Sequence, residues 1–257
     1  MKLKANKLVS HKLISLALDL IFPSACFSCR AYLERNEKPH LVCEKCKKSI
    51  SLLNGFYCAE CGKRIPDMNQ NFTNHCHSGS FLVYACGQYN DIASRNIIHS
   101  LKYSSLKQAI APITSLLIRP ALTNYPLPAN SETVLVPIPL FKLKENLRGY
   151  NQSELIARAV SETINKNTDF KIPTLKILKR IKNTTSQTEI KNYADRAKNI
   201  QNCFSTNTKE ANKLKANEAK IVLIDDVFTS GATMTEAVKT LRQNGFKKIL
   251  GFAVLKT

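Results

Sequence analysis

The sequence predicts an α/β fold, a mainly parallel sheet with helices on both faces, preceded by a small cysteine-rich module. Two observations support this prediction. Buried-strand runs alternate with segments of helical periodicity from residue 133 to residue 255, and eight of the nine cysteines fall between Cys26 and Cys86. We therefore expect residues 1–86 to form an N-terminal helix and a cysteine-rich zinc-binding module, and residues 87–257 to form the α/β domain.

The N-terminus has a weak likeness to a secretory signal, because four lysines precede an apolar run from Leu13 to Phe22. Asp19 interrupts that run, and no long apolar core follows it. We therefore predict an amphipathic helix over residues 11–21 that leads into the cysteine-rich module. No other segment approaches the ~20 apolar residues of a membrane span, so we expect no such span.

Three Cys-x-x-Cys pairs occur in the cysteine-rich module. Two such pairs about 12–20 residues apart are typical of a zinc site, and thirteen residues separate the first two pairs here. Four thiolates complete a closed tetrahedral structural site, and reduced thiolates indicate a reducing compartment. The predicted zinc ligands are Cys26, Cys29, Cys43 and Cys46.

The sequence also offers a second set of zinc ligands, but it does not identify the fourth ligand of that set. A residue directly next to Cys76 in the sequence is poorly placed to bind the same ion. The Cys-x-x-Cys pairs could also combine differently, with Cys43 and Cys46 sharing an ion with another pair. We expect no catalytic zinc, because no three-ligand, His-rich site accompanies a general base. The candidate second set is Cys58, Cys61, Cys76 and His77, with His75 or Cys86 as alternative fourth ligands.

The elements after the module alternate between helix and strand. Two helices are expected between Tyr89 and Leu122, broken near residues 103–105, and prolines then indicate a loop. The later segments alternate as in a parallel sheet with crossover helices. The expected strands cover residues 133–138, 175–178, 220–224 and 248–255, and the expected helices cover residues 152–164, 193–200 and 234–243.

The chain is strongly basic, with 38 Lys and Arg residues against 19 Asp and Glu residues and a formal charge of +19. Such a charge attracts phosphate polyanions, whether nucleic acid, anionic lipid or a pyrophosphorylated metabolite. Scattered lysines, as between Lys209 and Lys220, fit a generally lysine-rich composition equally well. The charge therefore favours an anionic partner without identifying it.

The strongest chemical motif runs from Ile221 to Thr233. A buried strand delivers Asp225 and Asp226 to its carboxyl end, where open α/β sheets bind ligands. A loop of small residues then opens a helix, so backbone N–H groups and hydroxyls from Thr229 onward can surround a phosphate. The loop contains no lysine, which excludes a Walker motif. The alternative is a strand–turn–helix unit in which an Asp only caps the helix.

This segment resembles the motif by which type I phosphoribosyltransferases bind phosphoribosyl pyrophosphate (PRPP). The resemblance implies that Asp225 and Asp226 hold the ribose hydroxyls directly or through Mg²⁺. In a transferase of this class a nitrogen nucleophile attacks C1 of the ribose while pyrophosphate leaves with Mg²⁺, and no side-chain nucleophile is required. The residues implied to hold the 5′-phosphate are Val227, Phe228, Thr229, Ser230, Gly231, Ala232 and Thr233.

Further segments resemble the ComF family of competence proteins. Val136-Pro137-Ile138-Pro139 and Arg148-Gly149-Tyr150-Asn151-Gln152 resemble the P-V-P and R-G-F-N-Q elements of that family. With the cysteine pairs included, the resemblance spans nearly the whole chain. It implies a cytoplasmic protein of DNA uptake in natural transformation that binds PRPP and single-stranded DNA, with other DNA-uptake or recombination proteins as further partners. Other positions at the family's spacing are Ile97, Ile98, Leu101, Lys102, Tyr103, Arg180, Thr184, Gln187, Arg196, Asn199 and Phe204.

Basic residues near these motifs are candidate phosphate contacts. Arg148 follows a strand and precedes Gly149, which permits close backbone approach, so we predict a pyrophosphate contact; a surface Arg at a helix entrance is the alternative. Lys102 reaches the same cleft only if its helix packs across the strand ends; a solvated surface lysine is the alternative. Arg180 and Arg196 fit either phosphate contacts or ion pairs with nearby acids.

Two alternatives to this function stay open. One is an active phosphoribosyltransferase of the pentosyltransferase class, acting on an unidentified acceptor, and the other is a regulatory module that senses PRPP without breaking a bond. Single-strand binders combine a basic groove with stacking aromatic rings. Tyr150, Tyr193, Phe204 and Phe228 lie near basic residues in the sequence, but core or loop packing explains each of them equally well.

Overall fold

The computed structural model describes residues 24–65, 80–103, 107–124, 126–169, 171–184, 198–212, 214 and 218–257. The helix expected over residues 11–21 and most of the helical turn expected over residues 193–200 lie outside these ranges. Within them, no helix combines the length and the apolar character needed to cross a membrane.

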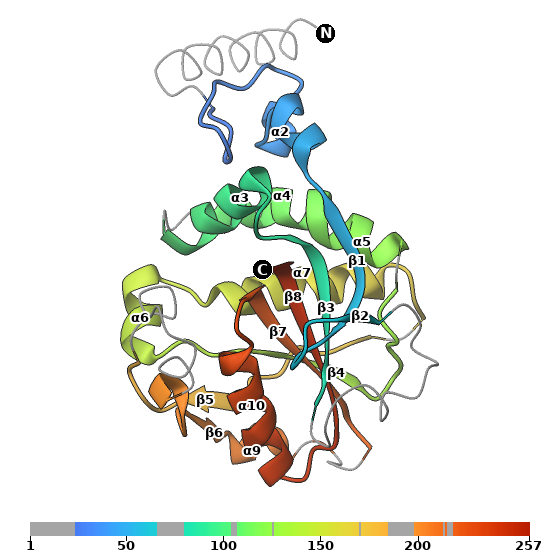
Figure 1. Ribbon diagram of the computed structural model, residues 1–257, viewed down its shortest axis with the longest axis vertical. Helices are drawn as coiled ribbons and strands as arrows, with labels where there is room; N and C mark the ends of the chain where they lie inside the picture. The colour runs from blue at the N-terminus through green and yellow to red at the C-terminus, as the bar shows by residue number, and fades with distance from the viewer. Residues whose placement is uncertain are drawn as a thin grey trace, which may run out of the picture.

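A six-stranded sheet forms the centre of the molecule, in the order β2-β1-β3-β8-β7-β4 (Figure 1). Its strands are β1 (Leu52–Cys58), β2 (Arg64–Ile65), β3 (Leu82–Gln88), β4 (Thr133–Pro137), β7 (Lys220–Phe228) and β8 (Lys248–Lys256). Strands β3, β8, β7 and β4 run parallel, whereas β1 pairs antiparallel with β2 and β3. A separate antiparallel pair joins β5 (Leu178–Arg180) to β6 (Phe204–Thr206). The predicted α/β fold with a mainly parallel sheet is confirmed.

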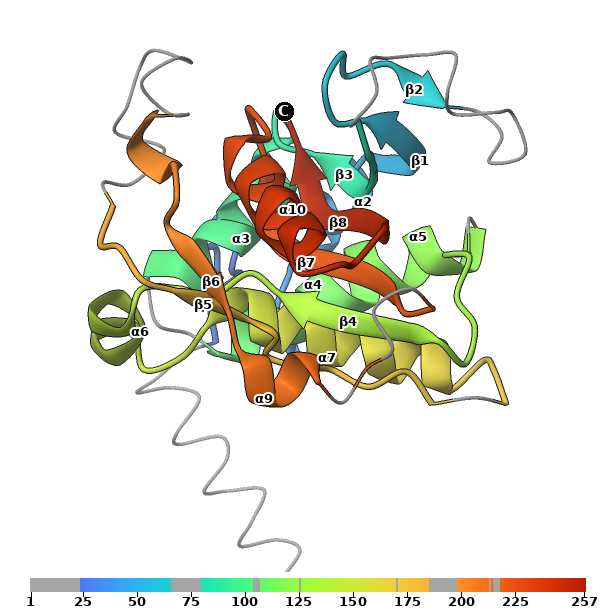
Figure 2. The same ribbon diagram turned by 90° about the horizontal axis from the view of Figure 1, so that it is seen from below.

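Helices cover both faces of this sheet (Figure 2). The helices of the described residues are η1 (Lys38–His40), α2 (Glu44–Ser49), α3 (Ile92–Tyr103), η3 (Lys107–Ala109), α4 (Ile110–Ile113), η4 (Thr114–Ile118), α5 (Arg119–Asn124), α6 (Lys142–Arg148), α7 (Gln152–Asn165), α9 (Thr208–Ala211) and α10 (Ala232–Gln243), of which η1 and α2 lie in the cysteine-rich module away from the sheet. On one face, α3 to α5 and α7 pack around a core that includes Ile97 and Ile156. On the other face, α10 and the β5–β6 pair enclose a second core that includes Leu223. Because β7 lies between the two cores, residues 221–224 are buried on both faces, which explains their unbroken apolar run.

The expected division of the chain between residues 86 and 87 falls inside β3. Strands β1 to β3 come from the segment expected to form the cysteine-rich module, yet they belong to the central sheet. Strand β3 pairs with β1 on one side and with β8 on the other, where Leu82 lies opposite Leu250. Within the described residues, the part of that segment outside the sheet is residues 24–50, which contain η1 and α2, together with short turns between the strands.

Most expected elements are present with shifted ends. The second helix expected before Leu122 is a succession of short helical pieces, η3, α4, η4 and α5, that ends at Asn124. The strand expected over residues 175–178 is β5, and a parallel bridge between Leu135 and Thr174 precedes it. These shifts keep the order of strands and helices, so the carboxyl ends of β4 and β7 still meet at one edge of the sheet.

Candidate functional site

Two adjacent carboxylates lie near the carboxyl end of β7, shortly before the start of α10. Asp226 is 3% exposed, and its Oδ1 forms an ion pair with Lys102 Nζ at 2.9 Å. Among the described residues, the second oxygen of Asp226, Oδ2, is buried without a hydrogen-bond partner. Since nearly all buried polar atoms in proteins are hydrogen-bonded, this orphaned acceptor fits a ligand hydroxyl or a hydrated cation.

Asp225 lies half-buried beside Asp226. Its Oδ1 accepts hydrogen bonds from Ser153 Oγ at 3.1 Å and from the Asp226 N–H at 2.9 Å. Burial, and then the neighbouring Asp226 charge, raise the pKa of Asp225 to about 7, although Lys102 acts in the opposite direction. At neutral pH the acid pair therefore carries a proton for part of the time, and a bound cation would displace that proton.

Residues 227–233, here called the glycine loop, connect β7 to α10. Gly231 has a φ of 75° in the left-handed region, and a Cβ at this position would lie 2.9 Å from the Phe228 ring. Both facts require glycine. Gly231 is also the N-cap of α10, whose first N–H groups have no partners within the helix. The glycine loop therefore brings the positive end of a helix close to the acid pair, which suits an anionic ligand.

Helix α3 packs across the strand ends, which is the condition under which Lys102 reaches the acid pair. The Lys102 side chain is 18% exposed, so its charge is largely shielded from water. Tyr150 OH donates to Leu101 O at 2.6 Å and so ties the loop after α6 to the last turn of α3. The structure thus brings Lys102, Asp225 and Asp226 together.

Arg148 ends α6, and its guanidinium donates to Gln152 Oε1 in the first turn of α7. Gly149 follows with a φ of 79°, and its N–H closes the helix by donating to Glu145 O at 2.7 Å. A Cβ at Gly149 would meet no atom within 4 Å. Glycine is therefore needed here for its positive φ, and not to let another group pack closely against the backbone. Arg148 is thereby held at the start of α7, the helix that also supplies Ser153.

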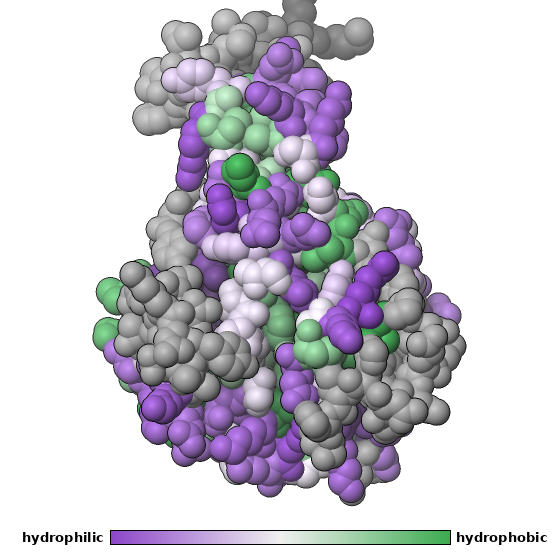
Figure 3. Space-filling view, in the orientation of Figure 1, coloured by the Kyte–Doolittle hydropathy of each residue, from purple (hydrophilic) through white to green (hydrophobic). Residues whose placement is uncertain are grey.

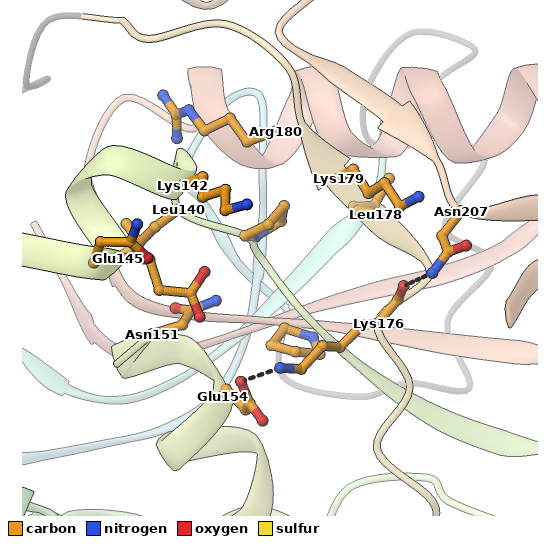
Figure 4. Close-up of a pocket in the computed structure, with 13 residues that line it drawn as sticks. Leu140, Lys142, Glu145, Asn151, Glu154, Lys176, Leu178, Lys179, Arg180 and Asn207 are labelled. Atoms are coloured by element: carbon orange, nitrogen blue, oxygen red, sulfur yellow. Dashed lines mark hydrogen bonds and ion pairs between the residues drawn. The ribbon is translucent and has the colours of Figure 1, made fainter. Parts of the chain in front are cut away.

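A cavity of about 520 Å³ opens between α6, the end of β4 and β5 (Figure 4). Glu154 and Lys176 form an ion pair of 2.7 Å in its wall, and Arg180 lies 5.5 Å from the centre of the Phe204 ring. Its walls combine cations with apolar surface, which suits a ligand that has an anionic group and an apolar ring. The other residues that line it are Pro137, Pro139, Leu140, Lys142, Glu145, Asn146, Asn151, Leu178, Lys179 and Asn207.

Four cysteines converge in the cysteine-rich module. The Sγ atoms of Cys26, Cys29, Cys43 and Cys46 all lie within 4.8 Å of one another. Zn–S bonds of about 2.3 Å place tetrahedral ligands about 3.8 Å apart, so small movements bring these four atoms onto one ion. Backbone N–H groups of Ser28 and Cys43 donate to Cys26 Sγ, each at 3.4 Å. Burial alone would raise the pKa of the Cys26 thiol, but backbone hydrogen bonds, led by that of Cys29, lower it to about 7 and favour the zinc-binding thiolate.

The second cysteine set is described only in part, because Cys76 and His77 lie outside the described residues, as does Arg196. Cys58 is 3% exposed at the end of β1, and Cys61 is exposed in the turn that follows. This turn adjoins the glycine loop, because a Cβ placed at Gly231 would lie 3.4 Å from the carbonyl oxygen of Ala59.

Cys86 was an alternative fourth ligand for this set. The strand partner of Cys58 is Leu82, and Cys86 lies four residues further along β3, about 13 Å away at the usual strand rise. Its side chain is fully buried in the core, and burial raises the pKa of the Cys86 thiol. The described geometry therefore separates Cys86 from the Cys58–Cys61 turn.

Residues 17–78 match the family model of the double zinc ribbon domain. The chain is 28% identical to competence protein F of Haemophilus influenzae over 240 residues, which cover 89% of this chain and 95% of that protein. It is 27% identical to competence protein ComFC of Bacillus subtilis over 246 residues, or 91% of each chain. The chain is a homologue of these competence proteins. DNA utilization protein YhgH of Salmonella typhi matches at 25% identity over 166 residues, which cover 63% of this chain and 66% of that protein.

In this competence-protein homologue, the zinc ribbon match and the four-cysteine cluster together support a structural zinc. The matched residues also include Cys58, Cys61, Cys76 and His77, the second candidate set. A closed thiolate site of this kind contributes to folding and needs no open coordination position.

Sequence reasoning missed the role of Asn151 and the exposure of Tyr32. Asn151 Oδ1 accepts from the Ser153 N–H at 3.0 Å, and its Nδ2 donates to Ile138 O at 3.0 Å. The residue therefore caps α7 and fixes that helix to the end of β4, and an Asn directly before a helix is the signal that predicts such a cap. Tyr32 is 76% exposed in the cysteine-rich module, and no sequence signal distinguishes it from a packed tyrosine.

Proposed function

We propose that this chain binds PRPP with Mg²⁺ at the carboxyl end of β7 and acts in cytoplasmic steps of DNA uptake during natural transformation. The observation that carries the PRPP proposal is the acid pair, half-buried Asp225 and buried Asp226, followed directly by the glycine loop and α10. The DNA-uptake role rests on homology to competence protein F and ComFC. A third relative has the name DNA utilization protein, which supports a role in DNA handling.

Each part of the site has a role in this proposal. Asp225 and Asp226 hold the ribose hydroxyls directly or through Mg²⁺, and the buried Asp226 Oδ2 is the acceptor that gains a partner. Lys102 reduces the repulsion between the two carboxylates while the site is empty of ligand. The glycine loop offers backbone N–H groups to the 5′-phosphate, and Arg148 is assigned to the pyrophosphate group. Bound Mg²⁺ would neutralise charge on that pyrophosphate.

We assign single-stranded DNA to the cysteine-rich module, because Tyr32 offers an exposed ring there. The aromatic residues considered from the sequence do not serve this purpose as well, since Tyr150, Phe204 and Phe228 are buried and Tyr193 lies outside the described residues. Hydrophilic side chains gather over α2 in Figure 3. Stacking on a ring combined with basic side chains is how proteins bind single strands without sequence preference. The Lys and Arg residues between residues 24 and 50 of the module are Arg30, Arg35, Lys38, Lys45, Lys47 and Lys48.

The cavity beside α6 favours a second candidate function, transfer of phosphoribose to an acceptor. Its volume of about 520 Å³ is in the range of small-molecule sites, and Asn151 borders both the cavity and the helix that carries Ser153. A nitrogen atom of the acceptor would form the new bond to C1 of the ribose. The bond from C1 to the pyrophosphate oxygen would break, and pyrophosphate would leave with that electron pair. Arg148 and the cavity cations would stabilise the leaving group.

Calorimetric titration of Mg²⁺–PRPP tests the proposed site. In the double variant Asp225→Asn/Asp226→Asn, the loss of two charge-assisted contacts of about 1.5–3 kcal/mol each weakens binding at least about a hundredfold. Glu132→Gln is the matched control, because this exposed acid lies at the opposite end of β4 and keeps wild-type affinity. Equal affinity of wild type and double variant, or no heat with wild type, overturns the PRPP proposal.

Labelled PRPP separates a transferase from a sensor once binding is established. The protein is incubated with Mg²⁺–PRPP and a panel of amines, nucleobases and oligonucleotides. Release of pyrophosphate that depends on one acceptor supports the transferase, whereas recovery of intact PRPP with every acceptor supports the sensor.

A further inference from the structure

Two side chains of helix α3, one turn apart, hydrogen-bond to the backbone between two cysteines of the four-cysteine cluster. Asn96 Nδ2 donates to Ser28 O at 3.0 Å, and Ser100 Oγ shares its one hydrogen between Phe27 O and the Asn96 carbonyl within the helix, each at 3.1 Å. The carbonyl groups of Phe27 and Ser28 lie inside the knuckle of residues 26–29, whose two cysteines belong to the cluster. The backbone of this knuckle is therefore attached directly to α3, which lies between α2 and the sheet in Figure 1.

The last turn of the same helix reaches the acid pair. Lys102 follows Ser100 by two residues and pairs with Asp226 at 2.9 Å, while Leu101 O accepts the hydrogen bond of Tyr150. Because an α-helix rises about 1.5 Å per residue, only about 3 Å of helix axis separates Ser100 from Lys102. Ile97 and Leu101 are fully buried, so the helix is packed as one unit between the two sites.

We propose that α3 couples metal occupancy of the four-cysteine cluster to ligand binding at the acid pair, with Asn96 and Ser100 as the positioning residues. This coupling rests on the PRPP function proposed above, and it adds a regulation of that site by the zinc ribbon. The Ala59 carbonyl lies beside Gly231, so the second cysteine turn borders the glycine loop directly, whereas the four-cysteine cluster reaches the acid pair only through α3.

The coupling has a direct physical cause. A metal held by Cys26 and Cys29 together fixes the two residues between them, so the carbonyls of Phe27 and Ser28 keep one position. Loss of the metal lets these two carbonyls move, so the hydrogen bonds that hold Asn96 and Ser100 of α3 in place are lost. A displacement of about 1 Å takes the 2.9 Å contact from Lys102 to its carboxylate beyond hydrogen-bond range. The buried carboxylate then lacks its counter-charge, and the ligand site loses its preformed geometry.

The test compares Asn96→Ala/Ser100→Ala with the matched control Ser161→Ala/Asn165→Ala. Each pair removes one Ser and one Asn that lie four residues apart on a helix and bind backbone groups of another segment, which for the control is Ile172. The full-length, zinc-loaded proteins are titrated with Mg²⁺–PRPP by calorimetry. We expect Asn96→Ala/Ser100→Ala to retain its zinc by elemental analysis and to bind PRPP at least about fivefold more weakly, and the control to match wild type.

Linkage requires the effect to be reciprocal. Saturating Mg²⁺–PRPP raises the chelator concentration that removes half of the zinc from wild type, and it does so by a smaller factor in Asn96→Ala/Ser100→Ala. If wild type binds PRPP but gains no protection of its zinc, or if this variant behaves like the control, the coupling is overturned.

Failure of the proposed function gives a different result, the absence of heat from wild type with Mg²⁺–PRPP. The coupling is then measured without ligand, by amide hydrogen exchange at residues 224–228. Faster exchange there in Asn96→Ala/Ser100→Ala than in the control, at equal zinc content, supports the coupling. Equal exchange in the two proteins overturns it.

Discussion

Lys102 Nζ lies 2.9 Å from Asp226 Oδ1, and this ion pair joins the last turn of α3 to the end of β7. The Asp226 side chain is only 4% exposed, so removal of the lysine leaves a buried carboxylate without its counter-charge. Breaking a buried pair in this way costs about 3–5 kcal/mol, and the partial exposure of Lys102 reduces that figure. We expect Lys102→Met to lower the free energy of unfolding by at least about 2 kcal/mol, measured by urea denaturation.

A double-mutant cycle provides the control for this prediction. Asp226→Asn removes the charge that Lys102 neutralises, so Lys102→Met costs less in that background, by at least about 1 kcal/mol. Strictly additive effects of the two substitutions would contradict a stabilising ion pair.

The acid pair also predicts how stability depends on pH. The pKa of Asp225 is raised from its ordinary value of 3.8 to about 7, chiefly by burial. A carboxyl group of this kind binds its proton more tightly in the folded chain, so its stabilising contribution is present at low pH and is lost as the pH rises through about 7. Asp225→Asn should therefore flatten the fall in stability between about pH 4 and pH 7, as measured by denaturation without ligand. A slope as steep as that of wild type would contradict the buried-carboxyl interpretation; Glu132→Gln is the control that keeps this slope.

Gly231 and Gly149 form a matched pair of substitutions. Both have positive φ, so alanine at either position costs about 1–2 kcal/mol of backbone strain. Only at Gly231 does the added Cβ also meet an aromatic ring, that of Phe228 at 2.9 Å. We expect Gly231→Ala to lower the Tm more than Gly149→Ala and to weaken Mg²⁺–PRPP binding as the loop shifts. Equal effects of the two substitutions on Tm would show that the steric contact is relieved without cost.

Tyr32 predicts the behaviour of the proposed DNA surface. Since base stacking on an aromatic ring contributes about 1–3 kcal/mol, Tyr32→Ala should weaken binding of a labelled single strand by a factor of about 5 to 140. Tyr32→Phe keeps the ring and should keep most of the affinity. Fluorescence anisotropy over a salt series also checks the electrostatic part, because release of counterions makes binding weaken as salt rises. Affinity that is independent of salt, or an equal loss in the Phe variant, would count against this surface.

The parts of the structure that the sequence predicts are those with local signals. The apolar run before Asp225, the two carboxylates, the small residues and the following helical periodicity adjoin one another, so the strand–loop–helix unit is visible in a short window. The cluster of four cysteines is equally local, since two closely spaced pairs set its geometry.

The parts that could not be predicted depend on contacts between distant segments. Strand β3 belongs to the central sheet because of its pairing with β8, which no pattern near residue 86 reveals. The contact from Asn96 to Ser28 and that from Lys102 to Asp226 join residues far apart in the sequence, so they appear only once α3 is packed. The sequence also left open whether the Phe228 ring stacks on a ligand or packs in the core. The structure shows it buried in the core beside Gly231.

The pairing of β3 with β8 has a consequence for the order of folding. The ligands of the four-cysteine cluster all lie within residues 26–46, so a nascent chain can close that cluster early in synthesis. Strand β3 pairs locally with β1, but its other edge has no partner until residues 248–256 have been made. Parallel pairing between such distant segments is slow and leaves a strand edge open to aggregation. Metal loading can therefore precede closure of the sheet during translation, and a closed cluster would order residues 26–46 of the waiting chain.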